Sequence, residues 1–177
     1  KEDAYVPREK CVGCGECAEV CPSGAHQIKD GRHLFEREKC TACGRCAEVC
    51  LGNALLFYGR EMTAKQLMAT ILEDRVFYES TGGGVTLSGG EPLVQADFCA
   101  ELLTMAKEEG LHTAVDTCGM VSWETFTKVL PVTDLFLYDV KQMDAALHQR
   151  YTGKENRLSV SNLRHLCERD AEVEVRI

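Results

Sequence analysis

The sequence contains no stretch that could span a membrane and has few of the basic residues that a nucleic-acid surface requires. No apolar run approaches the ~18 residues of a transmembrane segment, and no signal-peptide pattern opens the chain. Lysine and arginine total 20 against 28 aspartates and glutamates, for a net charge of −8. This balance argues against nucleic acid and leaves a protein or a small molecule as partner. We therefore expect a cytoplasmic protein without a membrane segment.

Histidine is sparse and cysteine is abundant. The five histidines are spread along the chain and predict no close pair of metal ligands; they are His26, His33, His112, His148 and His165. In contrast, eight of the 11 cysteines lie within positions 11–50. In a chain without a secretory signal, such spacing indicates metal or cofactor ligation more often than disulfides. A length of 177 residues allows a small cofactor module beside part of a larger fold.

Residues 9–21 (EKCVGCGECAEVC) and 38–50 (EKCTACGRCAEVC) are two copies of one motif, offset by 29 positions. Each copy reads C-x2-C-x2-C-x3-C, the spacing of bacterial two-cluster ferredoxins, in which the fourth cysteine ligates the other cluster. Glycines inside the runs let backbone N–H groups approach a cluster; they are Gly13, Gly15 and Gly44. The predicted ligands are Cys11, Cys14, Cys17 and Cys50 for one [4Fe–4S] cluster, and Cys40, Cys43, Cys46 and Cys21 for the other.

Residues 8–57 thus resemble the bacterial ferredoxins. Pro22 follows the first run as in that family, whereas Leu51 stands where a second proline is usual. Two zinc sites of four cysteines each would also satisfy the ligand count, although zinc does not require two interleaved runs. We expect residues 1–59 to form a small ferredoxin-like α+β domain.

From residue 60 onward the pattern changes to alternating strands and helices. The expected helices cover residues 64–72, 96–109, 123–130, 144–151 and 157–169, and the expected strands cover residues 85–87, 113–115, 135–140 and 172–177. Such alternation with short connections predicts an α/β fold with a parallel sheet, either a barrel or a doubly wound sheet. Cys99 and Cys167 fall on the apolar faces of expected helices and are predicted to pack in the core.

Polar residues follow four successive expected strands at their carboxyl ends, where parallel α/β folds bind ligands. They are Gly89, Gly90 and Glu91, then Asp116 and Thr117, then Asp139 and Lys141, and finally Arg176. The first group belongs to the stretch SGGEP, which matches neither a P-loop nor a dinucleotide-binding motif. Glu91 stands where a phosphate site would need a cation, so the stretch suits a ligand with a cationic amino group.

The stretches VTLSGGEP, DTCG, DLFLYDVKQMD and EVRI, in this order, resemble the activating enzymes of glycyl radical enzymes, a branch of the radical S-adenosylmethionine (SAM) superfamily that includes the pyruvate formate-lyase activating enzyme. The subgroup with a two-cluster ferredoxin insert matches best, over essentially the whole chain. The resemblance implies a partial radical SAM (β/α) barrel in residues 60–177. It also implies an oxidoreductase that reductively cleaves SAM and takes hydrogen from a glycine of a partner enzyme. Further implications are a flavodoxin or ferredoxin electron donor, a monomer, and an anaerobic cytoplasm.

The resemblance also implies roles for individual residues. Gly89, Gly90 and Glu91 match the motif that receives the SAM amino group. Asp139, Val140 and Lys141 match a D-x-K element near SAM, and Lys141 and Arg176 are the residues expected to face the reaction. A monovalent cation would be held by Asp116, Thr117, Asp139 and the carbonyl of Leu137. The alternatives are a helix-end acid or a solvated loop acid for Asp116, a surface lysine for Lys141, and a structural ion-pair partner for Arg176.

One departure from the family pattern limits the prediction. The family's catalytic cluster is held by C-x3-C-x2-C, which does not occur in residues 1–177. We expect this motif upstream of the two-cluster insert, both ends to be cut from a longer protein, and the chain by itself to be unable to cleave SAM. A two-cluster electron carrier without SAM chemistry, or a radical SAM enzyme acting on a small molecule, are the alternatives. Cys118 is expected near the site, without an assigned role.

Overall fold

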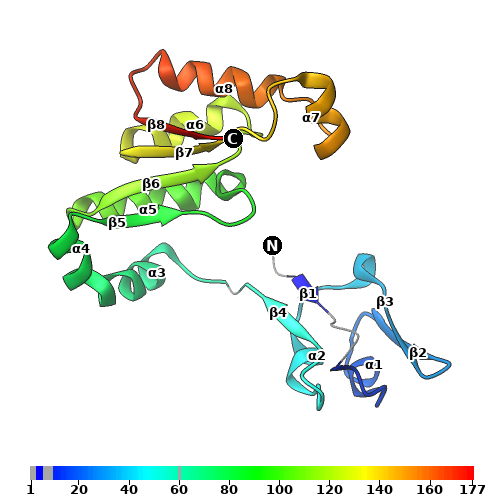
Figure 1. Cartoon of the computed structure of the whole chain (residues 1–177). Coiled ribbons are helices and arrows are strands. Elements are labelled where there is room, and N and C mark those ends of the chain that lie inside the picture. Colours follow the sequence, from blue (N-terminus) through cyan, green and yellow to red (C-terminus); the bar gives the residue numbers. More distant parts are fainter. Residues whose placement is uncertain (1–2, 6–9, 60) are drawn as a thin grey trace. The chain divides into compact units, whose positions relative to one another are not determined.

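The computed structural model describes residues 3–5, 10–59 and 61–177 and consists of two compact units, Lys1–Glu61 and Met62–Ile177 (Figure 1). Arg8, where the ferredoxin resemblance begins, and Arg60, where the second domain was predicted to begin, lie outside the described residues. Among the helices that the structure describes, none has the length and apolar character needed to cross a membrane. Because the two units are separate bodies, each is described by itself.

The repeat in the first unit extends from the cysteines to the backbone. The short helices α1 (Glu16–Glu19) and α2 (Arg45–Glu48) each begin after a left-handed glycine, Gly15 in one copy and Gly44 in the other. Two further hydrogen bonds repeat at the same offset. Ala25 N–H donates to Cys21 Sγ and Ala54 N–H donates to Cys50 Sγ, each at 3.2 Å. The two copies of the motif therefore fold alike.

The described residues of the first unit also form four short strands. Strand β1 (Asp3–Tyr5) pairs antiparallel with β4 (Leu56–Tyr58). Strands β2 (His26–Lys29) and β3 (Arg32–Phe35) form an antiparallel hairpin, followed by the 3-10 turn η2 (Arg37–Lys39). Asp30 and Gly31 connect β2 to β3 with φ angles of 51° and 70°. An Asp-Gly pair with two positive φ angles is the turn that matches the twist of a two-residue hairpin.

The second unit opens with helices that lead into the sheet. Thr63 caps α3 (Ala64–Ile71) through a reciprocal capping box with Gln66, as the sequence predicted for this residue. The turn η3 (Leu72–Asp74) and helix α4 (Arg75–Thr81) follow and were not predicted. None of the seven residues of α4 is buried. Because sequence periodicity reports a buried face, a helix without one gives little signal.

The predicted parallel α/β fold is confirmed. Strands β5 (Gly84–Leu87), β6 (His112–Thr117), β7 (Leu135–Asp139) and β8 (Val173–Arg176) form one parallel sheet in the order β5-β6-β7-β8 (Figure 1). The connecting elements are η4 (Pro92–Gln95), α5 (Ala96–Glu108), α6 (Trp123–Val129), η5 (Leu130–Val132), α7 (Ala145–Thr152) and α8 (Arg157–Cys167). The predicted strands and helices occur with ends shifted by a few residues.

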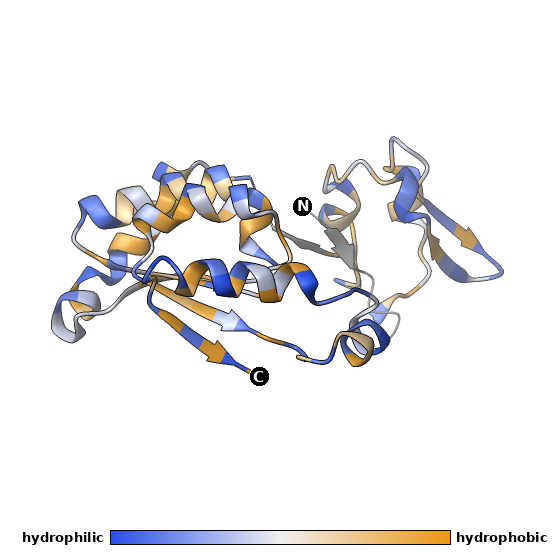
Figure 2. Cartoon of the chain, turned by 90° about the horizontal axis from the view of Figure 1, so that it is seen from above, coloured by the Kyte–Doolittle hydropathy of each residue, from blue (hydrophilic) through white to orange (hydrophobic). Residues whose placement is uncertain are grey.

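Alternation along β6 and β7 separates the core from the site. Val115, Phe136 and Tyr138 point toward α5, α6 and α8 and pack in one core cluster with Phe126 and Leu166. Figure 2 shows that the helices of this unit carry both hydrophobic and hydrophilic residues. Burial of each such side chain contributes about 1.5–3 kcal/mol to folding. Because successive side chains of a strand point to opposite faces, the acidic residues next to them project from the other face.

The two helical cysteines differ in environment. Cys99 is 4% exposed and belongs to the core cluster beneath the sheet, as predicted. Cys167 is exposed, so its predicted packing in the core was wrong. The buried face of α8 runs through Ser159, Asn162 and Leu166, and Cys167 lies one position beyond that face.

A candidate ligand site at the carboxyl edge of the sheet

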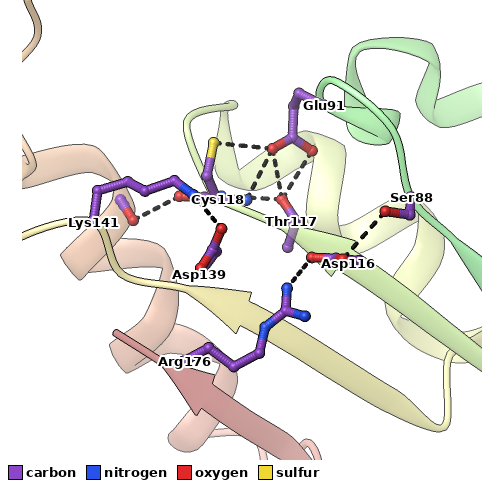
Figure 3. A network of polar contacts seen from close by, with 10 residues as sticks. Ser88, Glu91, Asp116, Thr117, Cys118, Asp139, Lys141 and Arg176 are labelled. Carbon is purple, nitrogen blue, oxygen red and sulfur yellow. Dashed lines mark hydrogen bonds and ion pairs between the residues drawn. The ribbon is translucent and has the colours of Figure 1, made fainter. Parts of the chain in front are cut away.

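The sheet register places acidic and basic residues of three strands on the face opposite the helical core. Asp116 pairs in register with Leu137, and Asp139 pairs with Arg176. These four side chains therefore project from the same face, near the carboxyl ends of β6, β7 and β8. The sequence had predicted that these residues meet at one edge, and the structure brings them together there (Figure 3).

Glu91 joins this edge from the loop after β5, and its carboxylate is held by the chain itself. It accepts hydrogen bonds from the Thr117 hydroxyl at 2.8 and 2.9 Å and from the Cys118 N–H at 3.0 Å. The Leu93 N–H donates to Oε1 of this half-buried carboxylate at 3.1 Å, so the Glu91 side chain also caps η4. Thr117 and Cys118 thus connect the loop after β5 to the end of β6 (Figure 3).

Of the two glycines before Glu91, one has a backbone conformation that requires glycine and the other does not. Gly89 has a φ of +123°, which only glycine adopts readily. Gly90 has no such φ, and among the described residues no heavy atom lies within 4 Å of the position that a Cβ would occupy there. The packing around Gly90 therefore gives no reason for glycine, and the missing side chain leaves open space beside the strand end.

Two ion pairs join two of the acidic residues of the edge to basic side chains. The Arg176 guanidinium pairs with Asp116, which also accepts a hydrogen bond from the Ser88 hydroxyl at 3.1 Å. Lys141 pairs with Asp139, and this hydrogen bond raises the pKa of the Lys141 ammonium group. Between these residues Val140 is buried, and its N–H donates to the Arg176 carbonyl at 2.8 Å. Ser88 was not predicted; a hydroxyl directly before the two glycines was the signal that could have indicated it.

Three polar residues near the start of α8 hold the loops of the site. Ser159 donates to the Cys118 carbonyl at 2.7 Å, and Asn162 Nδ2 donates to the carbonyls of Gly119 and Val121 at 2.9 and 2.7 Å. Asn156 Nδ2 donates in the same way to the carbonyls of residues 142 and 143, in the loop after β7. The sequence prediction missed these supports. Their spacing of three residues on the buried side of a helix was the available signal.

The turn after β6 fits closely against Tyr138. A Cβ on Gly119 would lie 1.6 Å from the Tyr138 hydroxyl, and Gly119 has a φ of +69°. The Tyr138 hydroxyl donates to the Ser159 carbonyl at 2.7 Å, and burial raises the pKa of Tyr138 to about 12. Next to this turn, burial and then the hydrogen bond to Glu91 raise the pKa of the Cys118 thiol. Cys118 therefore lies at the site as expected, and its thiol donates to Glu91 at 3.2 Å.

In the first unit, one of the two predicted cysteine sets surrounds a cavity. Its lining includes Cys11, Cys14, Cys17 and Cys50 together with apolar side chains such as Ile28 and Leu55. The pKa of the Cys17 thiol is raised by burial and by the charges of Cys11 and Cys14. Four sulfur atoms around an apolar cavity are the donor set that a [4Fe–4S] cluster uses, so these residues fit such a cluster.

The second set is brought together in part. Burial and the charges of Cys40 and Cys43 raise the pKa of the Cys46 thiol, which places these three cysteines near one another. The fourth predicted ligand, Cys21, accepts its hydrogen bond from Ala25, and no described contact joins it to the other three. Cys40 and Cys43 of the second set are thus close enough to Cys46 for their charges to act on its thiol.

Two histidines lie beside the first cysteine set, contrary to the expectation of no close pair. His26 Nδ1 and His33 Nε2 are 2.8 Å apart, and ring nitrogens of both lie within 4.8 Å of the Cys17 sulfur. The cause is the hairpin. His26 on β2 lies opposite Phe35 and Ile28 lies opposite His33, so the two histidines are diagonal neighbours on one face of the hairpin. Burial lowers the pKa of both imidazoles. The expectation was wrong because the two histidines are distant in sequence and are brought together by the hairpin that turns at Asp30 and Gly31.

Comparisons with protein families give two overlapping matches. The 4Fe-4S dicluster domain matches residues 4–51, and the Radical SAM superfamily matches residues 37–177. The second match covers more than half of the chain and includes the whole carboxyl edge described above.

Curated relatives carry the names of activating enzymes. The chain is 46% identical over 170 residues to the choline trimethylamine-lyase activating enzyme of Oleidesulfovibrio alaskensis, covering 94% of this chain and 55% of that protein. It is 45% identical to the trans-4-hydroxy-L-proline dehydratase activating enzyme of Clostridioides difficile, covering 96% of this chain and 56% of that protein. The chain thus spans about half the length of the curated relatives it matches.

A solved structure shows the same relationship. A domain of the pyruvate-formate lyase-activating enzyme from Bacteroides vulgatus superimposes with a TM-score of 0.50 at 38% identity, covering 54% of this chain and 59% of that chain. The match over residues 37–177, together with the parallel sheet and its polar carboxyl edge, shows that the chain belongs to the radical SAM superfamily.

Proposed function

We propose that this chain is part of an activating enzyme for a glycyl radical enzyme. The activity would be the one-electron reductive cleavage of SAM to methionine and a 5′-deoxyadenosyl radical. That radical would take a hydrogen atom from one glycine of the partner, giving 5′-deoxyadenosine and a glycyl radical. Residues 60–177 would supply the SAM site, and residues 1–59 would hold two [4Fe–4S] clusters. Convergence of Glu91, Asp116 and Asp139 at one sheet edge is the observation that carries the proposal.

Charge at the edge suits SAM. Three carboxylates, those of Glu91, Asp116 and Asp139, accompany two cationic side chains, Lys141 and Arg176, which leaves one net negative charge. SAM carries a sulfonium, an ammonium and a carboxylate, and therefore one net positive charge. The two signs are complementary, and a partly desolvated edge strengthens the attraction.

Open space beside Gly90 supports the position of the ligand. A methionyl group lying against residues 89–91 would meet no side chain at Gly90. Its ammonium group could donate hydrogen bonds to backbone carbonyls of this stretch, beside the Glu91 carboxylate. Asp139, Val140 and Lys141 would line the opposite side, with Lys141 and Arg176 facing the reacting groups.

A monovalent cation is a further part of the proposal. Asp116, Thr117, Asp139 and the Leu137 carbonyl would hold it beside the SAM carboxylate. Asp116 and Leu137 are register partners on neighbouring strands, which supports a shared position for these two of the four groups. A cation there would take over part of the charge compensation that Arg176 and Lys141 provide within the chain.

The first unit would pass electrons to the SAM-cleaving cluster. We propose [4Fe–4S] ligation by the two interleaved cysteine sets, with reduction by a flavodoxin or ferredoxin in an anaerobic cytoplasm and a monomeric enzyme. The cavity lined by Cys11, Cys14, Cys17 and Cys50 supports the first set. SAM cleavage would further require a C-x3-C-x2-C motif, which residues 1–177 do not contain.

SAM binding by residues 1–177 tests the site directly. Equilibrium dialysis with labelled SAM should show binding that weakens about tenfold, or ~1.4 kcal/mol, in Glu91→Gln. Glu101→Gln, on the exposed side of α5, is the matched control and should bind like the parent. Equal affinity of Glu91→Gln and the parent would exclude the proposed SAM site and would favour a two-cluster electron carrier.

A second experiment tests the activity. A polypeptide that joins residues 1–177 to a strand carrying C-x3-C-x2-C should release 5′-deoxyadenosine from SAM under a strong reductant, measured by chromatography. Residues 1–177 alone should release none. Deoxyadenosine from residues 1–177 alone would show that the proposed requirement for this motif is wrong.

A further inference from the structure

The first cysteine set has a polar neighbour. His33 lines the same cavity as Cys11, Cys14, Cys17 and Cys50. His33 is hydrogen-bonded to His26, which is 3% exposed and stacks on the Phe35 ring with ring centroids 4.8 Å apart. This packing fixes the orientation of the pair relative to the cavity. Ring nitrogens of both histidines lie within 4.8 Å of the Cys17 sulfur.

The repeat shows that this polar neighbour belongs to one copy only. At the offset of 29 positions Ala25 corresponds to Ala54, and both donate to a cysteine sulfur at 3.2 Å. The next position breaks the repeat, since His26 corresponds to Leu55. Cys17, its counterpart Cys46 and Leu55 lie in one buried cluster, and ring nitrogens of the histidine pair lie within 4.8 Å of the Cys17 sulfur. Residues 1–61 contain no histidine other than this pair.

The hydrogen bond between the rings uses one N–H group of the pair and leaves the other N–H group available. Each neutral imidazole carries one N–H group, and one of the two is used between His26 Nδ1 and His33 Nε2. Whichever ring donates, the accepting ring keeps its N–H group on its other nitrogen. That group belongs to a ring that has a nitrogen within 4.8 Å of the Cys17 sulfur. Hydrogen bonds and dipoles directed at cluster sulfurs raise the reduction potential, because the reduced cluster carries one more negative charge.

We propose that the His26–His33 pair makes the cluster held by Cys11, Cys14, Cys17 and Cys50 the more easily reduced of the two clusters in this chain. The step is the addition of one electron from an external reductant to that cluster. No protein bond forms or breaks and no proton moves. The pair stabilises the added charge, so electrons reside first on this cluster. The inference rests on the ligand sets in the proposed function.

The test is a redox titration of the reconstituted chain, followed by electron paramagnetic resonance. The parent should show two one-electron transitions with different midpoint potentials. His33→Leu should shift the higher midpoint to a lower potential and leave the other unchanged. His33→Gln keeps an N–H donor, so its higher midpoint potential should stay close to that of the parent. Gln27→Leu is the control and should change neither midpoint potential. Gln27 lies on the same hairpin, with its side chain bonded to Glu36.

Cysteine variants assign the two transitions. Cys14 and Cys43 are equivalent in the repeat and both exposed. Cys14→Ser should alter the transition that His33→Leu shifts, and Cys43→Ser should alter the other one. A single shared midpoint in the parent, or a His33→Leu shift in the transition that Cys43→Ser alters, would overturn the inference.

Metal content separates this inference from the ligand assignment. Iron and sulfide analysis of the parent should give two [4Fe–4S] clusters per chain, and one fewer on removal of Cys14 and Cys17 together. If the parent holds zinc or no cluster, the ligand sets fail. If it holds two clusters with equal midpoints, the ligand sets stand and the role of the histidine pair fails.

Discussion

Thr117 donates its hydroxyl hydrogen to the Glu91 carboxylate, with the Thr117 Oγ1 atom 2.8 and 2.9 Å from its two oxygens. The same Oγ1 atom accepts the Gly119 N–H at 3.0 Å. One buried hydroxyl thus joins the loop after β5, the end of β6 and the turn that follows. The candidate site is therefore organised by hydrogen bonds within the chain, which lowers the cost of ordering it around a ligand.

Removal of this hydroxyl should destabilise the second unit. Thr117→Val keeps the shape of the side chain but leaves Glu91 and the Gly119 N–H each without one partner. We expect a loss of about 1–3 kcal/mol in the free energy of unfolding, measured by urea titration of the fluorescence of Trp123, the single tryptophan. Thr104→Val on the exposed side of α5 should change it by less than about 0.5 kcal/mol. Equal effects of the two variants would contradict the role of Thr117.

A pair of glycine variants should separate backbone strain from steric overlap. Gly119 and Gly153 have φ angles of +69° and +77°, so alanine costs about 1–2 kcal/mol in conformational strain at either position. At Gly119 the new Cβ would also overlap the Tyr138 hydroxyl, whereas at Gly153 no described heavy atom lies within 4 Å of that position. Gly119→Ala should therefore lower the free energy of unfolding by at least about 2 kcal/mol more than Gly153→Ala. Similar losses would show that the turn can move away from Tyr138.

Sequence patterns predicted the elements that bury a regular face. Helix α5 places Leu102 and Ala106 in a core cluster and ends before Gly110, as its periodicity indicated. Helix α4 was missed because it buries no residue, although Val76 and Phe77 gave it apolar character. Periodicity thus reports packing against a neighbour rather than helix formation itself.

Positions within the site were predictable, but the hydrogen bonds were not. Parallel strands have their carboxyl ends at one edge, so a polar residue after each strand predicted the meeting of Asp116, Asp139 and Arg176. Two features depend on how the loops pack against α8. They are the orientation of the Glu91 carboxylate toward Thr117 and the hydrogen bond from Asn162 to the Gly119 carbonyl. Such contacts join residues 26 and 43 positions apart, and no local rule predicts them.

Asp134 should make stability depend on pH. Burial raises the pKa of this carboxyl, but hydrogen bonds from Lys107 and Thr113 outweigh burial, so the pKa is lower in the folded chain. A lowered pKa contributes stability that is fully present above the unfolded value of about 3.9 and is lost as the pH falls through the folded pKa. The stability difference between the parent and Asp134→Asn should therefore be largest near neutral pH and shrink below about pH 4, measured by Trp123 fluorescence in urea.

An exposed acid provides the control for this pH dependence. Asp97 pairs with Lys128 but is 87% exposed, so solvent screens the pair. Asp97→Asn should change stability little at any pH in the same assay. A constant difference between the parent and Asp134→Asn across the pH range would mean that the asparagine acts through altered packing rather than through lost charge.

Alkylation of three cysteines should report both the packing and the site. Burial raises the pKa of the Cys99 thiol to about 11 and also raises that of Cys118, and raised values reduce the reactive thiolate. With iodoacetamide near pH 8, exposed Cys167 should react first, Cys118 slowly, and Cys99 only after unfolding, as followed by peptide mass spectrometry. SAM should slow Cys118 further and leave Cys167 unchanged, because only Cys118 bonds to Glu91. Protection of neither residue by SAM, in a chain whose Cys99 stays unreactive, would place SAM binding away from this edge of the sheet.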